Sequence, residues 1–284
     1  VLRSVDKNVE GALPRMVRKT FAVDLVQDGI SQSHPYGALA VPRLADALGV
    51  LHTSPEIVFL PDDPALGIYR EELKNKLFLF EERPDDDRSD VPGFGYSTKI
   101  ISTHKVIDKI QSHHNHKIDQ NSVLKARLLD TFISDWDRHD DQWRWAAFFP
   151  EDITLYKPIP RDRDQVFFVA EGPVMWLAAR KWLVPKFQGF DHDTKYMGGL
   201  VYNARFFDRS FLNELDREQW LSIASLLQDK LRDEVLWEAI YDMPEAVSSI
   251  SGNEIFGKLC SRRDKLVDFA FEHYKLLAKR VDVV

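Results

Sequence analysis

The sequence predicts an α+β, bilobal protein in which a small mixed α/β lobe precedes a larger, mainly helical lobe. Three observations lead to this prediction. Short β-type runs lie near the start of the chain, at residues 1–6, 56–60 and 77–82. From Phe211 onward the hydrophobic pattern is helical. Between these parts, RPDDDRSDVPGFGYST has the charge and the Pro/Gly density of a loop. The predicted parts are a partial first lobe at 1–84, a linker loop at 85–98 and the second lobe at 99–284.

The elements of the first lobe follow from local signals. Pro14 is well placed in the first turn of a helix, and Gly49 is a normal helix stop. A Pro/Asp/Gly turn region separates the last two strands. The expected elements are, in order, a strand at 1–6, a helix at 14–27, a helix at 36–48, and strands at 56–60 and 77–82.

The second lobe begins with a helix expected at 102–111, followed by a histidine-rich loop, SHHNH. A second helix is expected from Asn121 to Trp136, because its apolar residues recur at helical spacing along one face. ITLY then has the pattern of a strand. After a break at Met243 and Pro244, the chain should end in a long helix from about Lys258 to Lys279.

Composition narrows the class of protein. The 284 residues are 44% hydrophobic and 12% aromatic, which is typical of a globular chain with a buried core. A net charge of -7 argues against non-specific nucleic-acid binding and polybasic membrane contact. The single cysteine, Cys260, excludes an intramolecular disulfide and a cysteine-based zinc site. No apolar run approaches the roughly 20 residues of a membrane span. Because the chain opens on VLRSV, we expect it to be part of a longer polypeptide, and the compartment stays unknown.

Two dense charged clusters need a chemical reason. The first cluster is DWDRHDD at 135–141, and the second is RDRD at 161–164. Crowded carboxylates raise each other's pKa unless a cation or basic side chains neutralise them. Two explanations stay open at this point, a bound divalent metal and an internal Asp/Arg salt-bridge network.

The spacing within the clusters fits phosphoryl transfer. Such a site needs an Asp that orients the acceptor, ligands for a metal that bridges the phosphates, and a basic group on the phosphates. Asp137 is followed five positions later by Gln142, and Asp162 comes after the strand-like run. This order matches the order of the catalytic and metal motifs in kinases.

The motifs resemble those of atypical kinases. DWDRHDDQW resembles the D-x-H-x-x-N loop of the spore-coat protein kinase (CotH) group, the HipA-like kinases, the secretory-pathway kinases and the phosphatidylinositol kinases. IPRDRDQVF is similar to the P-W-D-x-D-x-x-F metal motif of the CotH group. VLRSVDKN resembles that group's L-K-A/S strand, and the run from LADALGV to LFLFEE resembles its helix-strand-strand order. The likeness touches most of residues 1–170.

The resemblance implies a kinase-like fold that uses ATP and Mg²⁺ or Mn²⁺ on a protein or small-molecule hydroxyl. It implies that Asp137 orients the acceptor, that His139 braces the loop and that Asp162 holds the metal. Gln142 stands where the family has a metal-binding Asn, and Asp141 or Asp140 could take over that ligation.

The same resemblance gives the expected nucleotide contacts. Arg3 stands where the family has its phosphate-binding Lys, and Lys7 is the alternative in a different register. Glu81 or Glu82 would lie at the hinge that meets adenine. Asp164 is a second metal ligand or a partner of an arginine.

Two other functions stay open. A metal-dependent phosphoesterase or nuclease also uses Asp/His-rich clusters, although the candidate ligands (His113, His114, His116, His192) lack motif spacing. A kinase-fold module that has lost catalysis could act as a binding domain of a larger protein. The departures at Gln142 and Arg3 favour this second alternative.

Overall fold

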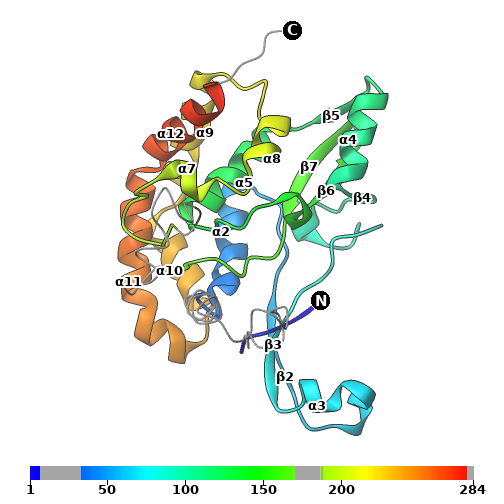
Figure 1. The fold of residues 1–284 in the computed structure, drawn as a ribbon, viewed down its shortest axis with the longest axis vertical. Coiled ribbons are helices and arrows are strands. Elements are labelled where there is room, and N and C mark those ends of the chain that lie inside the picture. Colours follow the sequence, from blue (N-terminus) through cyan, green and yellow to red (C-terminus); the bar gives the residue numbers. More distant parts are fainter. Residues whose placement is uncertain (7–32, 170–185, 187, 280–284) are drawn as a thin grey trace, which may run out of the picture.

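The computed structural model describes residues 1–6, 33–169, 186 and 188–279. The expected helix at 14–27 and Lys7 lie outside the described residues. In the described part, helices form one side of the molecule, a sheet of four strands forms the other, and a smaller sheet projects below them (Figure 1). The architecture is mixed α/β with a mainly helical later part, as the sequence predicts.

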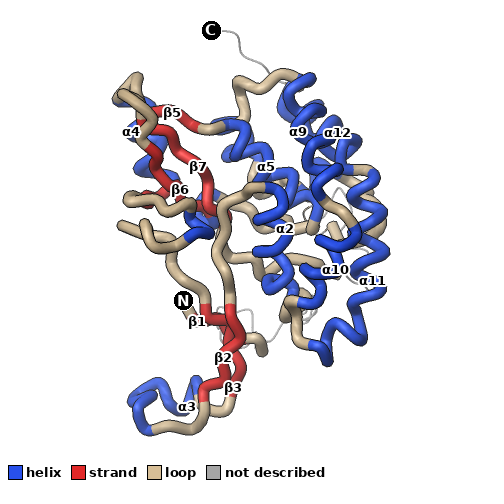
Figure 2. Tube along the Cα trace, turned by 180° about the vertical axis from the view of Figure 1, so that it is seen from behind, coloured by secondary structure: helices blue, strands red, loops and turns tan. Residues whose placement is uncertain are grey.

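The smaller sheet contains the three strands expected at the start of the chain. These are β1 (Leu2–Ser4), β2 (Glu56–Leu60) and β3 (Lys76–Phe80), in the order β1-β3-β2 with antiparallel pairing. A 3-10 helix (Pro64–Tyr69) and α3 (Arg70–Leu73) connect β2 to β3. Figure 2 shows this sheet below the main body, with α3 at its far end. In this register Arg3 lies opposite Leu79.

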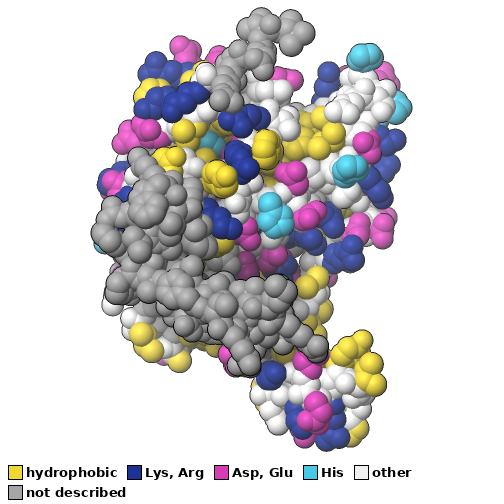
Figure 3. Space-filling model, viewed as in Figure 1, with side chains coloured by type: hydrophobic (Ala, Val, Ile, Leu, Met, Phe, Trp, Pro, Cys, Tyr) yellow, Lys and Arg dark blue, Asp and Glu magenta, His cyan; other side chains and the backbone are white. Residues whose placement is uncertain are grey.

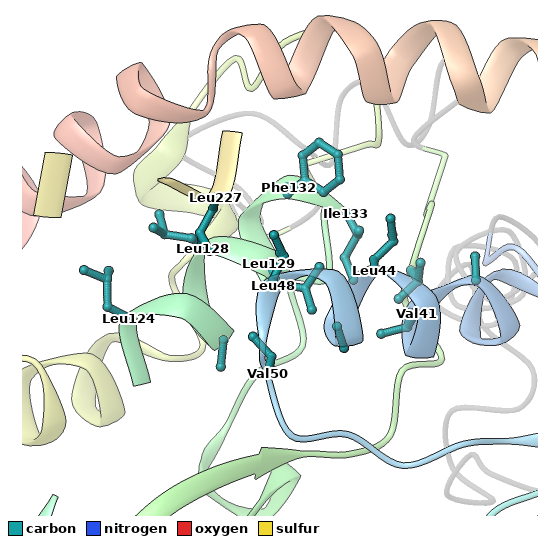
Figure 4. Packing of buried hydrophobic residues seen from close by; sticks show 14 of the residues in the cluster. Val41, Leu44, Leu48, Val50, Leu124, Leu128, Leu129, Phe132, Ile133 and Leu227 are labelled. Atoms are coloured by element: carbon teal, nitrogen blue, oxygen red, sulfur yellow. The ribbon is translucent and has the colours of Figure 1, made fainter. Parts of the chain in front are cut away.

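The helix expected at 36–48 forms as a 3-10 turn, Gly37–Ala40, that runs into α2 (Val41–Leu48). It ends at Gly49, whose φ of 66° is in the left-handed region that glycine adopts without strain. Although α2 comes early in the sequence, it packs on α5 (Gln120–Phe132) and α10 (Asp233–Tyr241) within the helical core. Figure 4 shows Leu44 and Leu48 of α2 beside Leu129 of α5. Leu44 and Leu48 of α2 are fully or almost fully buried there.

The larger sheet has the order β4-β6-β7-β5. Its strands are β4 (Ile100–Ser102), β5 (His116–Ile118), β6 (Trp143–Phe148) and β7 (Thr154–Pro160), and β5 pairs parallel to β7 while the other pairs are antiparallel. β7 extends the strand-like ITLY. The sequence did not predict β6, because WRWAAF is buried on both faces and lacks the alternation of a half-buried strand. His116, expected in a loop, lies in β5 and stacks on Tyr156.

Helices make up most of the rest. α4 (Thr103–Ser112) begins after Ser102, whose hydroxyl accepts a hydrogen bond from the Lys105 N–H. α5 is Gln120–Phe132. The expected extension of this helix to Trp136 is wrong, because Ser134 has a φ of 55° and turns the chain.

The later helices are α7 (Met197–Leu200), α8 (Arg205–Phe211), α9 (Arg217–Lys230), α10 (Asp233–Tyr241), α11 (Glu245–Asp264) and α12 (Leu266–Ala278). The single helix expected from Lys258 to Lys279 is wrong. α11 already begins after Pro244, which supplies a fixed φ at the helix start, and a break at Lys265 separates it from α12. In the described part of the chain, every helix is too short or too polar to cross a membrane.

Candidate active site

A buried network of arginines and aspartates joins the two charged clusters. Arg163 of the second cluster pairs with Asp130 at the end of α5 and with Asp135 at 2.8 Å. Arg138 of the first cluster lies 3.4 Å from Asp130 and 3.5 Å from Asp135. Arg127 extends the network, 2.5 Å from Asp130. All five side chains are at most 5% exposed, so the network lies inside the protein.

Burial and neighbouring charges determine the ionisation of these groups. Burial raises the pKa of Asp130, but Arg163, Arg138 and Arg127 outweigh it and hold the pKa below the usual range. The pKa of Asp135 is raised, because burial outweighs its two arginine partners. Removing one partner of such a buried pair lowers the free energy of unfolding by about 3–5 kcal/mol, since it leaves a buried charge without a partner.

The network separates structural from accessible carboxylates. The salt-bridge interpretation is confirmed for Asp135, Arg138 and Arg163, whereas Asp137 and Asp162 have other partners and stay partly exposed. Each of these two carboxylates is the direct sequence neighbour of a buried arginine. In addition, Arg138 Nη1 donates to the carbonyl oxygen of Arg161 at 2.8 Å. The network therefore fixes both carboxylate-bearing loops to one buried point.

A further buried arginine, from α11, supports the same junction. Arg262 is fully buried and donates to the carbonyl oxygens of Phe132 and Thr131, both at 2.6 Å. These are C-terminal carbonyls of α5, which have no partner within their own helix. Burial lowers the pKa of Arg262 to about 9. Arg262 thus caps the helix that leads into the first cluster.

Asp137 is held by a residue from a distant segment. Its Oδ1 accepts a hydrogen bond from Asn203 Nδ2 at 2.7 Å. The next functional candidates along the loop contact one another, because His139 Nε2 lies 3.3 Å from Gln142 Nε2. His139 is exposed, whereas Gln142 is 6% exposed. The backbone of Gln142 also fixes the loop, since its carbonyl oxygen accepts from Arg138 Nη2 at 3.2 Å and from the Arg161 N–H at 3.0 Å.

Asp162 faces the smaller sheet. Its carboxylate pairs with Arg3 of β1, and Arg3 also lies 3.4 Å from the carboxylate of Glu81, which directly follows β3. The Asp162 side chain is 30% exposed, and the residue has a φ of 61°, which is uncommon for a residue other than glycine. Arg3 and Glu81 line a small cavity together with Asp164 and Arg163. Three residues chosen from separate parts of the sequence therefore meet at one place, between the small sheet and the second cluster.

Arg161 gives this place a positive character that the sequence did not single out. Burial lowers its pKa, and the nearby charges of Arg144 and Arg3 lower it further. Its guanidinium donates to the carbonyl oxygen of Asp141, at 3.1 Å from Nη2. Within the described residues Arg161 forms no ion pair, so its charge is available to an anion.

A larger cavity of about 570 Å³ lies beside the first cluster. His139, Asp140 and Asp141 line one side of it. The start of α4, Arg144 of β6, and the segment around Asn203 and Phe206 line the rest. Figure 3 shows this face, where histidine, acidic and basic side chains adjoin between the helices and the larger sheet.

The remaining predicted site residues do not lie together in one cavity. Asp141 lines the large cavity and Asp164 the small one, so the structure does not bring these two to the same cavity. Glu81 is 5% exposed, and its N–H donates to the carbonyl oxygen of Val1 at 2.9 Å. Glu82 is exposed, and Lys7 lies outside the described residues. In the described ranges, no group of three or more His, Cys, Asp or Glu side chains has a metal-binding arrangement.

Two functional candidates had weak or no signals in the sequence. Arg161 belongs to the second cluster but matches no motif position. Asn203 lies in a stretch without a recognisable pattern, and only the tertiary contact with Asp137 reveals it.

The chain is similar to proteins of known structure. The sequence matches no protein-family model and no curated protein sequence. Among solved structures, the chain is similar to the proinflammatory kinase CtkA of Helicobacter pylori, with 14% identity over 88% of each chain and a TM-score of 0.42. It is also similar to a Shewanella oneidensis HipA, HipB and operator DNA complex, with 13% identity, a TM-score of 0.41, and coverage of 89% of this chain and 58% of that chain. Likeness at this level does not transfer an activity from one protein to another.

Proposed function

We propose that this protein is a kinase-fold phosphotransferase that uses Mg²⁺ and ATP and transfers phosphate to a hydroxyl group. The observation that carries the proposal is the separation of roles within the charged clusters. The buried arginines neutralise Asp130 and Asp135, while Asp137 and Asp162 stay partly exposed on loops tied to the same network. Phosphoryl transfer needs this kind of fixed positioning more than it needs covalent chemistry.

The phosphates would lie between the small sheet and the second cluster. Arg3 pairs with Asp162, and Arg161 directly precedes Asp162 in the chain. Each can donate to phosphate oxygens through a planar guanidinium. In this structure Arg3 pairs with Asp162, so nucleotide binding would exchange that carboxylate for phosphate. The phosphate of a metal-phosphate complex would bind the arginine, and its metal ion would bind the carboxylate.

The donor set fits Mg²⁺ in particular. Asp162 and Asp164 supply hard carboxylate oxygens, and Gln142 can supply an amide oxygen. Mg²⁺ usually binds through one or two carboxylates together with substrate phosphates and water, so a complete protein cage is unnecessary. When bound, the ion would neutralise charge that develops on the transferred phosphate.

Asp137 would accept a hydrogen bond from the acceptor hydroxyl and take its proton. Asn203 Nδ2 holds one of its oxygens, Oδ1, and so fixes the direction of the carboxylate. His139 and Gln142 support the loop from the other side through their mutual contact. Proton transfer by a positioned carboxylate is an ordinary contribution in this class of reaction.

The second candidate function is a nucleotide-binding module without turnover. The burial of Gln142 and its contact with His139 favour this candidate, because both commit the Gln142 side chain to the loop. In that case ATP would bind and stabilise the fold, but no phosphate would reach an acceptor.

Thermal unfolding with and without Mg²⁺ and ATP tests the proposal. A ligand that binds the folded state raises the midpoint. We expect a rise for the wild type and none for Asp162→Ala. Transfer of labelled phosphate to the protein itself or to a generic acceptor protein should then disappear in Asp137→Ala, which keeps the rise. No rise in the wild type contradicts the proposal, and a rise without transfer favours the module without turnover.

A further inference from the structure

A second cavity, of about 360 Å³, lies on the helical side of the molecule between α7, α8 and the end of α12. Its volume is within the range of small-molecule sites. We name it the α8 pocket, and its lining residues are Tyr196, Gly198, Val201, Tyr202, Arg205, Asp208, Arg209, Leu276, Leu277 and Lys279. None of the residues assigned above to the nucleotide or to the acceptor lines it.

Positive charge dominates the α8 pocket. Arg205 and Arg209 lie one helical turn apart on α8, and Lys279 approaches from the end of α12. In the part of the chain that the structure describes, none of these three side chains forms an ion pair. This concentration of cations contrasts with the net charge of -7 of the whole chain.

The one carboxylate of the α8 pocket is already neutralised. Asp208 is fully buried and accepts from Arg127 Nε at 2.6 Å and from Arg127 Nη2 at 3.2 Å. His273 Nε2 lies 2.8 Å from Oδ2 of the same carboxylate, the oxygen that also accepts from Arg127 Nη2. Burial raises the pKa of Asp208, but Arg127 and His273 outweigh it and keep the pKa below its usual value. Asp208 therefore does not cancel the charge of the three cations, of which Arg209 and Lys279 are exposed and Arg205 is partly buried.

The walls of the α8 pocket also fix its shape. Arg205 donates to the carbonyl oxygen of Tyr202 at 2.7 Å and lies over the Tyr202 ring, 4.1 Å from its centroid. A Cβ atom at Gly198 would come within 3.0 Å of three atoms of the Tyr196 side chain, so glycine allows that ring its position. Val201 and the leucines of α12 supply an apolar wall. Figure 3 shows basic and hydrophobic side chains side by side over α7 and α8.

We propose that the α8 pocket binds a small phosphate monoester that carries an aromatic or apolar group. Three cations match the near-dianionic charge of a phosphate monoester better than the single charge of a carboxylate, and arginine binds phosphate oxygens in pairs. The tyrosine rings and the aliphatic wall would cover the organic part. Tyr202 and Arg205, which line the α8 pocket, lie within two positions of Asn203 in the sequence, and Asn203 holds Asp137.

Calorimetric titration with phenyl phosphate tests this site. We expect phenyl phosphate to bind the wild type at least about tenfold more tightly than benzoate, which has the same ring and one charge. Inorganic phosphate should bind more weakly than phenyl phosphate, because it lacks the ring. Arg209→Ala should weaken phenyl phosphate binding about tenfold, since one charge-assisted contact is lost. Arg209 is exposed, so this variant should fold.

Two control variants separate this site from other phosphate sites. Arg217→Ala removes an exposed arginine of α9 that does not line the α8 pocket, and it should bind phenyl phosphate like the wild type. Arg3→Ala alters the proposed nucleotide cavity and should also bind normally. Loss in Arg3→Ala with retention in Arg209→Ala would overturn the α8 site and leave the proposed function intact. Failure of the wild type to bind, or equal loss in Arg209→Ala and Arg217→Ala, would also overturn it.

Discussion

Replacement of Arg163 by methionine should destabilise the protein strongly, because it removes a central cation of the buried network. In the wild type Arg163 contacts both Asp130 and Asp135. In the variant Asp135 keeps only Arg138, 3.5 Å away. Within the described residues, Asp135 Oδ1 has no hydrogen-bond partner even in the wild type.

The expected loss is about 3–5 kcal/mol, the cost of leaving a buried charge unpaired. For a chain of this size, each kcal/mol lost from the free energy of unfolding lowers the midpoint of thermal unfolding by about 2 °C. The midpoint should therefore fall by about 6–10 °C. Arg161→Met is the matched control, two residues away in the same loop. Its guanidinium contacts a backbone carbonyl and no carboxylate in the described part, so its midpoint should change by less than about 2 °C.

The pH dependence of stability gives a second measure of the unpaired charge in Arg163→Met. The pKa of Asp135 is already raised by burial, and the loss of Arg163 should raise it further. A raised acid pKa penalises the folded state above that pKa, and the penalty disappears as pH falls through it and the carboxyl takes up a proton. The stability of Arg163→Met should therefore approach that of the wild type toward acid pH. Equal losses in Arg163→Met and Arg161→Met at neutral pH would show that Arg163 does not neutralise the buried carboxylates.

Four further variants test the site and its surroundings. Arg262→Met should lower the free energy of unfolding by about 3 kcal/mol, measured by urea titration, because two helix carbonyls lose their charged donor. Asp137→Asn should abolish phosphate transfer with the unfolding midpoint within about 2 °C of the wild type, and Asn203→Ala should reduce transfer in part, both followed with labelled ATP. Gly37→Ala should cost about 1–3 kcal/mol, seen as a lower unfolding midpoint, because its Cβ would lie 2.8 Å from the carbonyl oxygen of Val166.

The sequence predicted the elements whose signals are local. The strand expected at 56–60 is β2, and Gly49 ends α2, as expected, and does so in the left-handed conformation. The sequence did not reveal β6, whose burial on both faces hides the alternation. It also extended α5 too far, because the turn at Ser134 has no Gly or Pro to mark it.

For the candidate site, the sequence could locate both clusters but could not divide their charges. Asp135 and Asp137 differ by two positions, yet only the tertiary structure shows that one is buried against arginines and the other is held by Asn203. Such pairings join residues far apart in the chain, and local patterns do not encode them. The meeting of Arg3 with Asp162 is of the same kind, since 159 positions separate them.

We propose that Asp162 and Arg3 receive a magnesium-nucleotide complex. Calorimetric titration of a non-hydrolysable ATP analogue, with Mg²⁺ and with EDTA, tests this binding mode. We expect the wild type to bind the analogue more tightly with Mg²⁺, Asp162→Asn to lose the Mg²⁺ dependence, and Arg3→Ala to bind more weakly under both conditions. Absence of binding to the wild type, or an unchanged Mg²⁺ dependence in Asp162→Asn, would contradict it.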